Sequence, residues 1–289
     1  MTTLIFGASG QDGYYLSELL KQEGHKVLDI SRQGSIIKAD VADYSVTREL
    51  IREHKPEYIF HMAANSTTKH EALFENHATI ATGTLNILEA VKKFSSQSKV
   101  FISGSGLQFK NNGKPIKETD DFEARDPYSV SRIHSVYASR YYRKLGIRSY
   151  VGYFFNHDSL LRSERHIAQN IAATASRIAK GTNEKIAIGD INIIREWGYA
   201  GDIVKGIWKL VQQDEITEAV IGTGKGFSIK DWLEECFELI DKDWTDYVEP
   251  AQDFVADYKE LVSDPSTIFS LGWKPEVDLA GLAAMMVKK

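Results

Sequence analysis

Three glycines near the amino terminus are spaced as a phosphate-binding turn requires. Gly7, Gly10 and Gly13 follow the short apolar segment 4–6 and lead into an apolar helical pattern. Gly7 would allow the tight turn off a strand, Gly10 the close approach of a pyrophosphate, and Gly13 close packing of the helix on the sheet. The helix start would offer free N–H groups and its positive dipole end to the phosphates. The pattern therefore predicts a dinucleotide site with contacts from Gly7, Ser9, Gly10, Gln11, Asp12 and Gly13.

Apolar strands and amphipathic helices alternate along the first half of the chain. Parallel strands joined by right-handed helical crossovers form a sheet with helices on both faces, and ligands bind at the carboxyl ends of the strands. We therefore predict an α/β fold, a Rossmann-type doubly wound parallel sheet with a smaller mixed α/β lobe. The predicted strands are residues 2–6, 26–30, 35–38, 57–61, 98–103 and 147–155, and the predicted helices lie near 11–23, 45–54, 71–94 and 128–145.

The rhythm of the pattern changes after about residue 156. Longer helices near 164–180, 200–213 and 228–239 then alternate with short strands. We assign residues 1–155 to the dinucleotide-binding domain, with part of 200–225 returning to it. Residues 156–289 would mainly form the lobe that holds the substrate.

The end of the second strand indicates which nicotinamide dinucleotide is bound. An acidic side chain there would accept from the ribose 2′-hydroxyl and repel a 2′-phosphate. This chain has Ser31 and Arg32 instead, whose hydroxyl and guanidinium favour NADP(H) over NAD(H). In the alternative interpretation, Arg32 stacks on the adenine or lies in solvent. Asp40 is placed to accept from the adenine amino group. The other expected cofactor contacts are Val41, Met62, Ala63 and Ala64.

Composition and charge argue against several classes of protein. The 289 residues carry a formal net charge of -5 without a run of like charges, which argues against nucleic acid or an anionic membrane surface as a partner. No apolar run reaches the length of a membrane span. The single cysteine, Cys236, lies in an amphipathic stretch and is expected in a core, and such sparse cysteine fits a reducing cytoplasm. The histidines show no metal-ligand spacing, so no metal is predicted.

Several strings resemble the extended short-chain dehydrogenase/reductases. They are the glycine motif, His61-Met62-Ala63-Ala64, Ser103-Gly104-Ser105 and Tyr128-Ser129-Val130-Ser131-Arg132. Within that family the chain is most similar to the branch of GDP-mannose 4,6-dehydratase and GDP-4-keto-6-deoxymannose reductase. The strings typical of the branch are Gly10-Gln11-Asp12-Gly13-Tyr14-Tyr15-Leu16, Phe155-Asn156-His157-Asp158-Ser159 and Arg195-Glu196-Trp197-Gly198-Tyr199-Ala200-Gly201-Asp202. The resemblance continues through Asp264-Pro265 to Leu271-Gly272-Trp273-Lys274-Pro275.

The resemblance implies a catalytic set of Ser105, Tyr128 and Arg132. In the family a tyrosine is the general acid/base on a sugar hydroxyl or ketone while a nicotinamide exchanges hydride at the same carbon. A serine or threonine binds the reacting oxygen, and a lysine four residues after the tyrosine binds the nicotinamide ribose. A free phenol is almost fully protonated at neutral pH, so a cation one helical turn away must favour the phenolate. Here the lysine position is Arg132, which keeps the charge but is longer and planar.

One position departs from the dehydratases of this branch. Their glutamate, two residues after the serine or threonine, handles the proton during loss of water across C5 and C6, and here that position is Leu107. An apolar side chain cannot take a proton. We therefore expect an NADP(H)-dependent enzyme acting by hydride transfer at C4 of a nucleotide-activated, GDP-linked hexose, with 4-ketoreductase the favoured form. The alternatives are a 4,6-dehydratase whose base lies elsewhere, and a catalytically eroded protein that only binds the nucleotide sugar or NADP.

The resemblance also implies the substrate contacts. Asn156 would contact the sugar or its diphosphate, and Arg195 a phosphate or the nucleoside ribose. A guanidinium suits a diphosphate because its donors form a fork. Arg162 matches the family's segment after the Asn-His string, and a solvated charge at a helix start is the equal alternative. A late arginine of the family is Phe254 here, which weakens the case for guanine.

Further implications concern assembly and the remaining histidines. The resemblance implies a homodimer that pairs helices 71–94 and 128–145, and a cytoplasmic enzyme of surface polysaccharide assembly. His61 lies in an apolar strand, where a core histidine is expected. His157 is expected to be structural and to orient the loop after its strand.

Overall fold

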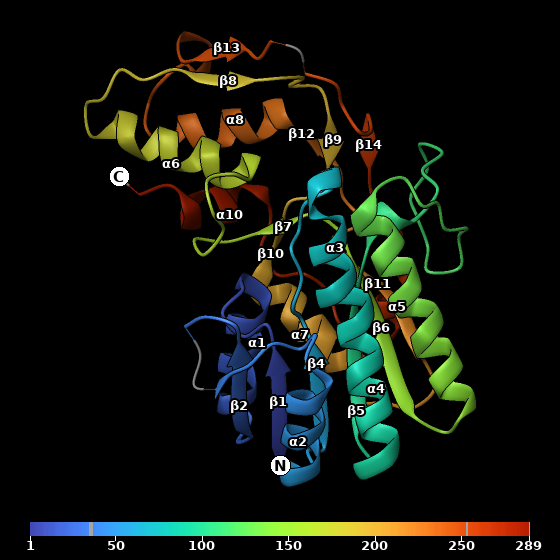
Figure 1. Ribbon diagram of the computed structural model, residues 1–289. Coiled ribbons are helices and arrows are strands. Elements are labelled where there is room, and N and C mark those ends of the chain that lie inside the picture. The colour runs from blue at the N-terminus through green and yellow to red at the C-terminus, as the bar shows by residue number, and fades with distance from the viewer. Residues whose placement is uncertain (35–36, 253, 289) are drawn as a thin grey trace.

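A computed structural model describes residues 1–34, 37–252 and 254–288 (Figure 1). Its largest element is a seven-stranded sheet in the order β11-β6-β5-β4-β1-β2-β3, with every neighbouring pair parallel. The order runs outward from β1 in both directions, which confirms the predicted doubly wound sheet. Residues 35–36 of the predicted third strand lie outside the described residues. The strands are β1 (Thr2–Phe6), β2 (Lys26–Ser31), β3 (Ile37–Lys38), β4 (Tyr58–His61), β5 (Lys99–Ser105), β6 (Arg148–Phe154) and β11 (Glu218–Ile221).

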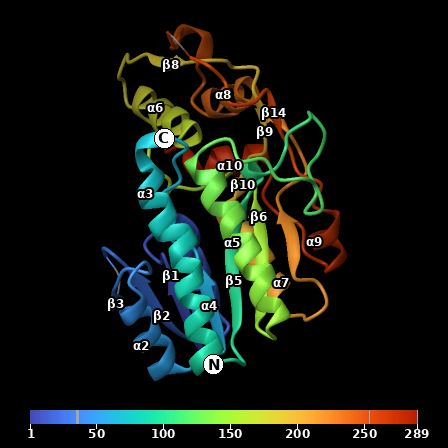
Figure 2. The same ribbon diagram turned by 45° about the vertical axis from the view of Figure 1, so that its right-hand side comes forward.

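Alternating side chains of the central strand reach two separate cores. Leu4 and Phe6 belong to a cluster with helices α2, α4 and α5, whereas Ile5 belongs to a cluster with α1 and α7. Successive side chains of a strand point to opposite faces, so both faces of the sheet are covered, as Figures 1 and 2 show. These helices are α1 (Gln11–Gln22), α2 (Tyr44–His54), α4 (Gly83–Phe94), α5 (Pro127–Lys144) and α7 (Ala200–Val211).

The predicted helix near 71–94 is a succession of different helical turns. A 3-10 turn η1 (His70–Ala72) and α3 (Leu73–Asn76) lead into a π-helical stretch η2 (His77–Thr82) before α4. The Ile80 carbonyl in the π-helical stretch accepts from Thr84 Oγ1 at 2.7 Å and from Ser135 Oγ at 3.1 Å. This carbonyl therefore joins the composite helix to α5.

A second lobe lies over the carboxyl edge of the sheet (Figure 1). Its core is a separate cluster in which the Trp197 and Trp232 rings stack 4.8 Å apart. Cys236 is fully buried in this cluster, which confirms its predicted place in a core. The remaining helices are α6 (Ile167–Ala179), α8 (Ile229–Glu238), α9 (Ser266–Ser270) and α10 (Leu279–Met286), with 3-10 turns η3 (Gly106–Gln108) and η4 (Trp244–Asp246). The short strands pair as β10 (Gly198–Tyr199) with β7 (His157–Asp158), β12 (Phe227–Ser228) and β14 (Glu260–Leu261) with β9 (Ile194–Arg195), and β13 (Val248–Pro250) with β8 (Ile186–Ile188).

Two kinds of feature are absent from the described part of the chain. None of its helices combines the length and the apolar character needed to cross a membrane. The same residues contain no group of three or more His, Cys, Asp or Glu side chains arranged to hold a metal ion.

Candidate active site

The glycine turn joins β1 to α1 at the carboxyl edge of the sheet. Gly7 has φ +91°, and a Cβ there would lie 2.4 Å from the backbone nitrogen of Ala63. A Cβ at Gly13 would lie 2.3 Å from the Gly7 carbonyl oxygen. Gly10 is instead the exposed N-cap of α1, and no described side chain caps the helix there. Gly10 also borders two cavities at this edge of the sheet. Packing thus requires two of the glycines, and the third leaves the helix start open to a ligand.

A cavity of about 620 Å³ lies beside the glycine turn, at the ends of β1, β2 and β4. It brings together ten of the residues predicted to contact the cofactor. The cavity borders the uncapped start of α1 at Gly10, which fits a dinucleotide phosphate. Its predicted lining residues are Gly7, Ser9, Gly10, Ser31, Arg32, Asp40, Val41, Met62, Ala63 and Ala64.

Arg32 is ion-paired at this cavity. Its Nη2 lies 2.9 Å from Oε1 of Glu75, and Glu75 Oε2 accepts from Asn65 Nδ2 at 2.8 Å. The hydrogen bond from Arg32, with that from Asn65, lowers the pKa of Glu75. Asp40 Oδ1 accepts from the Ala42 backbone nitrogen at 2.9 Å. A 2′-phosphate would therefore compete with Glu75 for Arg32.

A second cavity, of about 460 Å³, contains the predicted catalytic set. Ser105 ends β5, and its Oγ accepts from the Leu107 backbone nitrogen at 3.2 Å. Tyr128 stands in the first turn of α5, which begins after Asp126 because the Asp126 carboxylate accepts from the Ser129 backbone nitrogen at 2.8 Å. Ser105 and Tyr128 are buried, and both line the cavity together with Leu107.

Arg132 lies one helical turn after Tyr128 and packs against it. Its guanidinium carbon is 5.0 Å from the centre of the Tyr128 ring. Its Nη1 donates to the carbonyl oxygen of Ser103 and, at 2.7 Å, to Ser103 Oγ. Arg132 is 4% exposed, and its Nε has no hydrogen-bond partner among the described residues. The structure therefore gathers Ser105, Tyr128 and Arg132 at one cavity, with a buried cation against the phenol ring.

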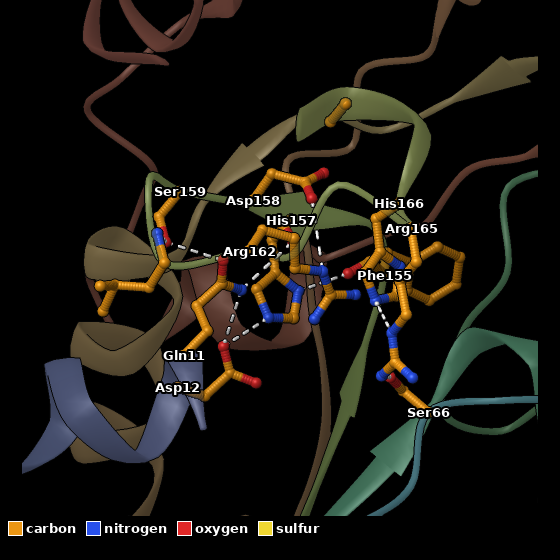
Figure 3. A network of polar contacts seen from close by, with 12 residues as sticks. Gln11, Asp12, Ser66, Phe155, His157, Asp158, Ser159, Arg162, Arg165 and His166 are labelled. Atoms are coloured by element: carbon orange, nitrogen blue, oxygen red, sulfur yellow. Dashed lines mark hydrogen bonds and ion pairs between the residues drawn. The ribbon is translucent and has the colours of Figure 1, made fainter. Parts of the chain in front are cut away.

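A polar network joins the start of α1 to the loop after β6 (Figure 3). Asp12 Oδ1 lies 2.8 Å from His157 Nε2, and His157 Nδ1 lies 2.7 Å from the Phe155 carbonyl oxygen. Gln11 Oε1 accepts from Ser159 Oγ at 2.8 Å. Burial opposes ionisation of Asp12 and His157, but their attraction prevails, lowering the pKa of Asp12 to about 2 and raising the pKa of His157. Gln11 and Asp12, predicted as cofactor contacts, thus also hold this loop, and His157 orients it as predicted.

The three predicted substrate contacts line the second cavity. Arg195, in β9, has its guanidinium carbon 5.6 Å from the centre of the Trp197 ring. Arg162 Nε lies 3.5 Å from Asp158 Oδ1. Within the described residues, Asn156 Oδ1 and the Nε atoms of both arginines are buried without a hydrogen-bond partner. Because buried polar atoms are usually hydrogen-bonded, these are groups that a polar ligand would satisfy.

Sequence reasoning missed several residues of this cavity. Arg165 and His166 belong to the loop that carries Arg162, so their proximity to it along the chain was an available signal. The others come from the loop after β4 and the segment before β14, and only the fold brings these together. The missed residues are Ser66, Thr68, Arg165, His166, Asp257 and Tyr258.

Comparison with known proteins identifies the family. The family model described as "GDP-mannose 4,6 dehydratase" matches residues 4–286. The chain belongs to the GDP-mannose 4,6-dehydratase family. "GDP-mannose 4,6 dehydratase 2" of Arabidopsis thaliana is 31% identical to it over 98% of this chain and 85% of the relative. The resemblance noted from the sequence strings is thereby confirmed.

Solved structures share the fold of this GDP-mannose 4,6-dehydratase family member. A dTDP-glucose 4,6-dehydratase from Bacillus anthracis in complex with NAD gives a TM-score of 0.87 at 18% identity, covering 99% of this chain and 95% of that one. RMD from Pseudomonas aeruginosa complexed with NADPH gives 0.87 at 19% identity, covering 99% and 96%. At these identities the likeness shows the fold alone. Two positions at the cavity still depart from the family pattern: Arg132 in the catalytic set, and Leu107 two residues after Ser105.

Proposed function

We propose that this protein is an NADP(H)-dependent sugar-nucleotide 4,6-dehydratase acting on a GDP-linked hexose. The observation that carries the proposal is the second cavity, where Ser105 and Tyr128 share a lining with the unpaired polar atoms of Asn156 and Arg195. Family membership favours this reaction over the 4-ketoreductase that we expected from Leu107. The dehydratase, our alternative from the sequence, therefore becomes the leading function.

The chemistry at sugar C4 follows from the catalytic set. A bound nicotinamide would exchange hydride with C4 of the sugar. Tyr128 would take the proton of the C4 hydroxyl during oxidation, and Ser105 Oγ would donate a hydrogen bond to the reacting oxygen. Arg132, buried against the Tyr128 ring, would supply positive charge that stabilises negative charge on the phenol oxygen.

The substrate's diphosphate would lie on the guanidinium groups of Arg162 and Arg195. Arg195 Nε, which has no hydrogen-bond partner among the described residues, suits a phosphate oxygen, and Asn156 Oδ1 could accept from a sugar hydroxyl. Counted back from Asp264 without a gap, the family's late arginine falls at Phe254, which is about half exposed. GDP and UDP should therefore be compared directly, since this difference bears on the nucleobase.

For the cofactor we propose NADP(H). Arg32 would leave Glu75 for the 2′-phosphate, whose charge and several acceptor oxygens make it the stronger partner for a guanidinium. Ser31 lines the same cavity and would add a hydroxyl contact. NAD would leave the Arg32–Glu75 ion pair intact, whereas binding of NADP(H) would require this ion pair to break.

Leu107 favours a second candidate function, the 4-ketoreductase. Hydride transfer at C4 needs only Ser105, Tyr128, Arg132 and the cofactor, and all three residues line the cavity. No carboxylate at position 107 is required for that reaction.

Incubation with GDP-mannose and NADP⁺ separates the candidates. A 4-keto-6-deoxy product formed without net consumption of cofactor is expected of the dehydratase. Consumption of NADPH with GDP-4-keto-6-deoxymannose, and no product from GDP-mannose, would establish the reductase instead. Binding of both ligands without turnover in either assay would identify a binding protein that has lost catalysis.

We also propose a homodimer formed through α4 and α5, which lie side by side in Figures 1 and 2. Large apolar side chains are exposed on these helices, and an apolar surface of this kind is typical of an interface. They are Leu85, Val130, Tyr137 and Tyr141. The cytoplasmic location stays a prediction.

A further inference from the structure

The proposed dehydration includes a step for which the catalytic set holds no residue. Loss of water from a 4-keto sugar requires removal of the proton on C5, and Leu107 has no group to accept it. Asp12 and His157 line the cavity but bind each other at 2.8 Å. Tyr128 is already used at C4. A different cavity residue must therefore take the C5 proton.

His166 borders the same cavity and is partly buried there, at the N-cap of α6. Arg165 Nε donates to His166 Nε2 at 3.2 Å, and Arg165 Nη2 donates to Ser66 Oγ at 3.3 Å (Figure 3). Because Nε2 accepts this hydrogen bond, the neutral imidazole carries its proton on Nδ1. Nε2 of His166 thus has a lone pair that can accept a proton once its hydrogen bond from Arg165 breaks.

We propose that His166 is the proton acceptor for dehydration in this cavity, an inference that rests on the proposed function. Nε2 takes the proton from C5 of the 4-keto sugar nucleotide. The electrons of the C5–H bond form the C5=C6 double bond as the C6–O bond breaks. The departing hydroxyl takes the proton back from the imidazolium and leaves as water, so the step is balanced without any other reactant.

The charges around His166 make this step depend on bound substrate. Burial, together with the guanidinium groups of Arg162, Arg165 and Arg195, lowers the pKa of His166 to about 4. A diphosphate on Arg162 and Arg195 would cancel part of this repulsion and raise the pKa of His166. The imidazole therefore becomes a stronger base when a diphosphate occupies the cavity.

Deuterium exchange tests the base without requiring hydride transfer. The protein is incubated in D₂O with GDP-4-keto-6-deoxymannose, and uptake of deuterium at C5 is followed by mass spectrometry. His166→Gln should slow the exchange by about 10²-fold or more, whereas His54→Gln, at the far end of α2, should leave it unchanged. In the His166→Gln protein, adding Leu107→Glu should restore exchange, because it returns a carboxylate to the cavity.

A histidine titration by NMR provides the second test. The pKa of His166 is measured in the free protein and with saturating inorganic pyrophosphate or GDP, with Arg165→Ala as a variant expected to raise it without ligand. A pKa of His166 that stays unchanged in both complexes would overturn the inference. Full C5 exchange in the His166→Gln protein would overturn it as well. So would loss of C5 exchange on the single substitution Asp257→Asn. If the wild-type protein oxidises C4 but shows no C5 exchange, the role of His166 is rejected and the proposed C4 chemistry is retained. If the protein exchanges C5 but does not oxidise C4, the role of His166 is retained and the proposed C4 chemistry is rejected.

Discussion

Replacing Asp12 by Asn should destabilise the protein in a way that depends on pH. Asp12 and His157 join α1 to the loop after β6, 2.8 Å apart, with the His157 side chain buried and the Asp12 side chain 21% exposed. At about 1.4 kcal/mol per pH unit, the drop in the pKa of Asp12 from 3.8 to about 2 corresponds to about 2 kcal/mol of folding free energy. At a pH where Asp12 and His157 are both charged, Asp12→Asn should therefore lower the free energy of unfolding by about this amount.

The pH window follows from the two directions of shift. The pKa of Asp12 is lowered on folding, so its contribution is present above about 3.8 and is lost as the pH falls towards 2. The pKa of His157 is raised, so its contribution is present below 6.5 and is lost as the pH rises through the raised value. The cost of Asp12→Asn should therefore be largest between about pH 4 and pH 6.5.

Thermal unfolding at pH 3, 5 and 9 measures this effect. For a protein of this size, about 2 kcal/mol corresponds to a fall in Tm of about 4 °C, which we expect at pH 5 and in smaller measure at pH 3 and 9. Glu18→Gln, on the exposed side of the same helix, removes only a surface pair with Lys21 and should change Tm by less than about 1 °C. An equal cost at all three pH values would refute the assignment of this energy to the ion pair.

Further predictions concern the cavities and the proposed interface. Tyr128→Phe should lower kcat by about 10²- to 10⁴-fold, with the affinity for GDP retained in calorimetry, because only proton transfer is removed. Glu75→Gln should release Arg32 and raise the preference for NADP⁺ over NAD⁺ by up to about fivefold in binding titrations; an unchanged ratio would argue against Arg32 as the 2′-phosphate contact. Tyr141→Asp should shift the protein towards monomer in sedimentation velocity, and a dimer of unchanged affinity would place the interface elsewhere.

The choice between dehydratase and reductase shows that the reaction type cannot be inferred from one residue, Leu107, by itself. Leu107 replaces the glutamate that the family pattern places two residues after Ser105, and the loss of that acid/base group favoured a reductase. The structure shows that the cavity contains other groups able to move a proton, among them His166. A missing side chain therefore excludes a mechanism only when its neighbours in space are known.

Local sequence was sufficient for the elements and for sites made by neighbouring residues. The unbroken apolar run Leu4-Ile5-Phe6 specified a strand buried on both faces, and the glycine spacing specified the turn after it. The four-residue spacing of Tyr128 and Arg132 specified one face of α5. Such features depend on backbone geometry over a few residues, which the sequence encodes directly.

Contacts between distant segments were decided by the tertiary structure. Asp12 meets His157, Arg32 meets Glu75, and His166 enters the cavity of Leu107 only because parallel crossovers bring the carboxyl ends of separate strands to one edge. Residue types alone gave no partner for these charges, since pairing depends on which loops the crossovers place together. For the same reason, the charge state of His166 depends on arginines that only the fold assembles around it.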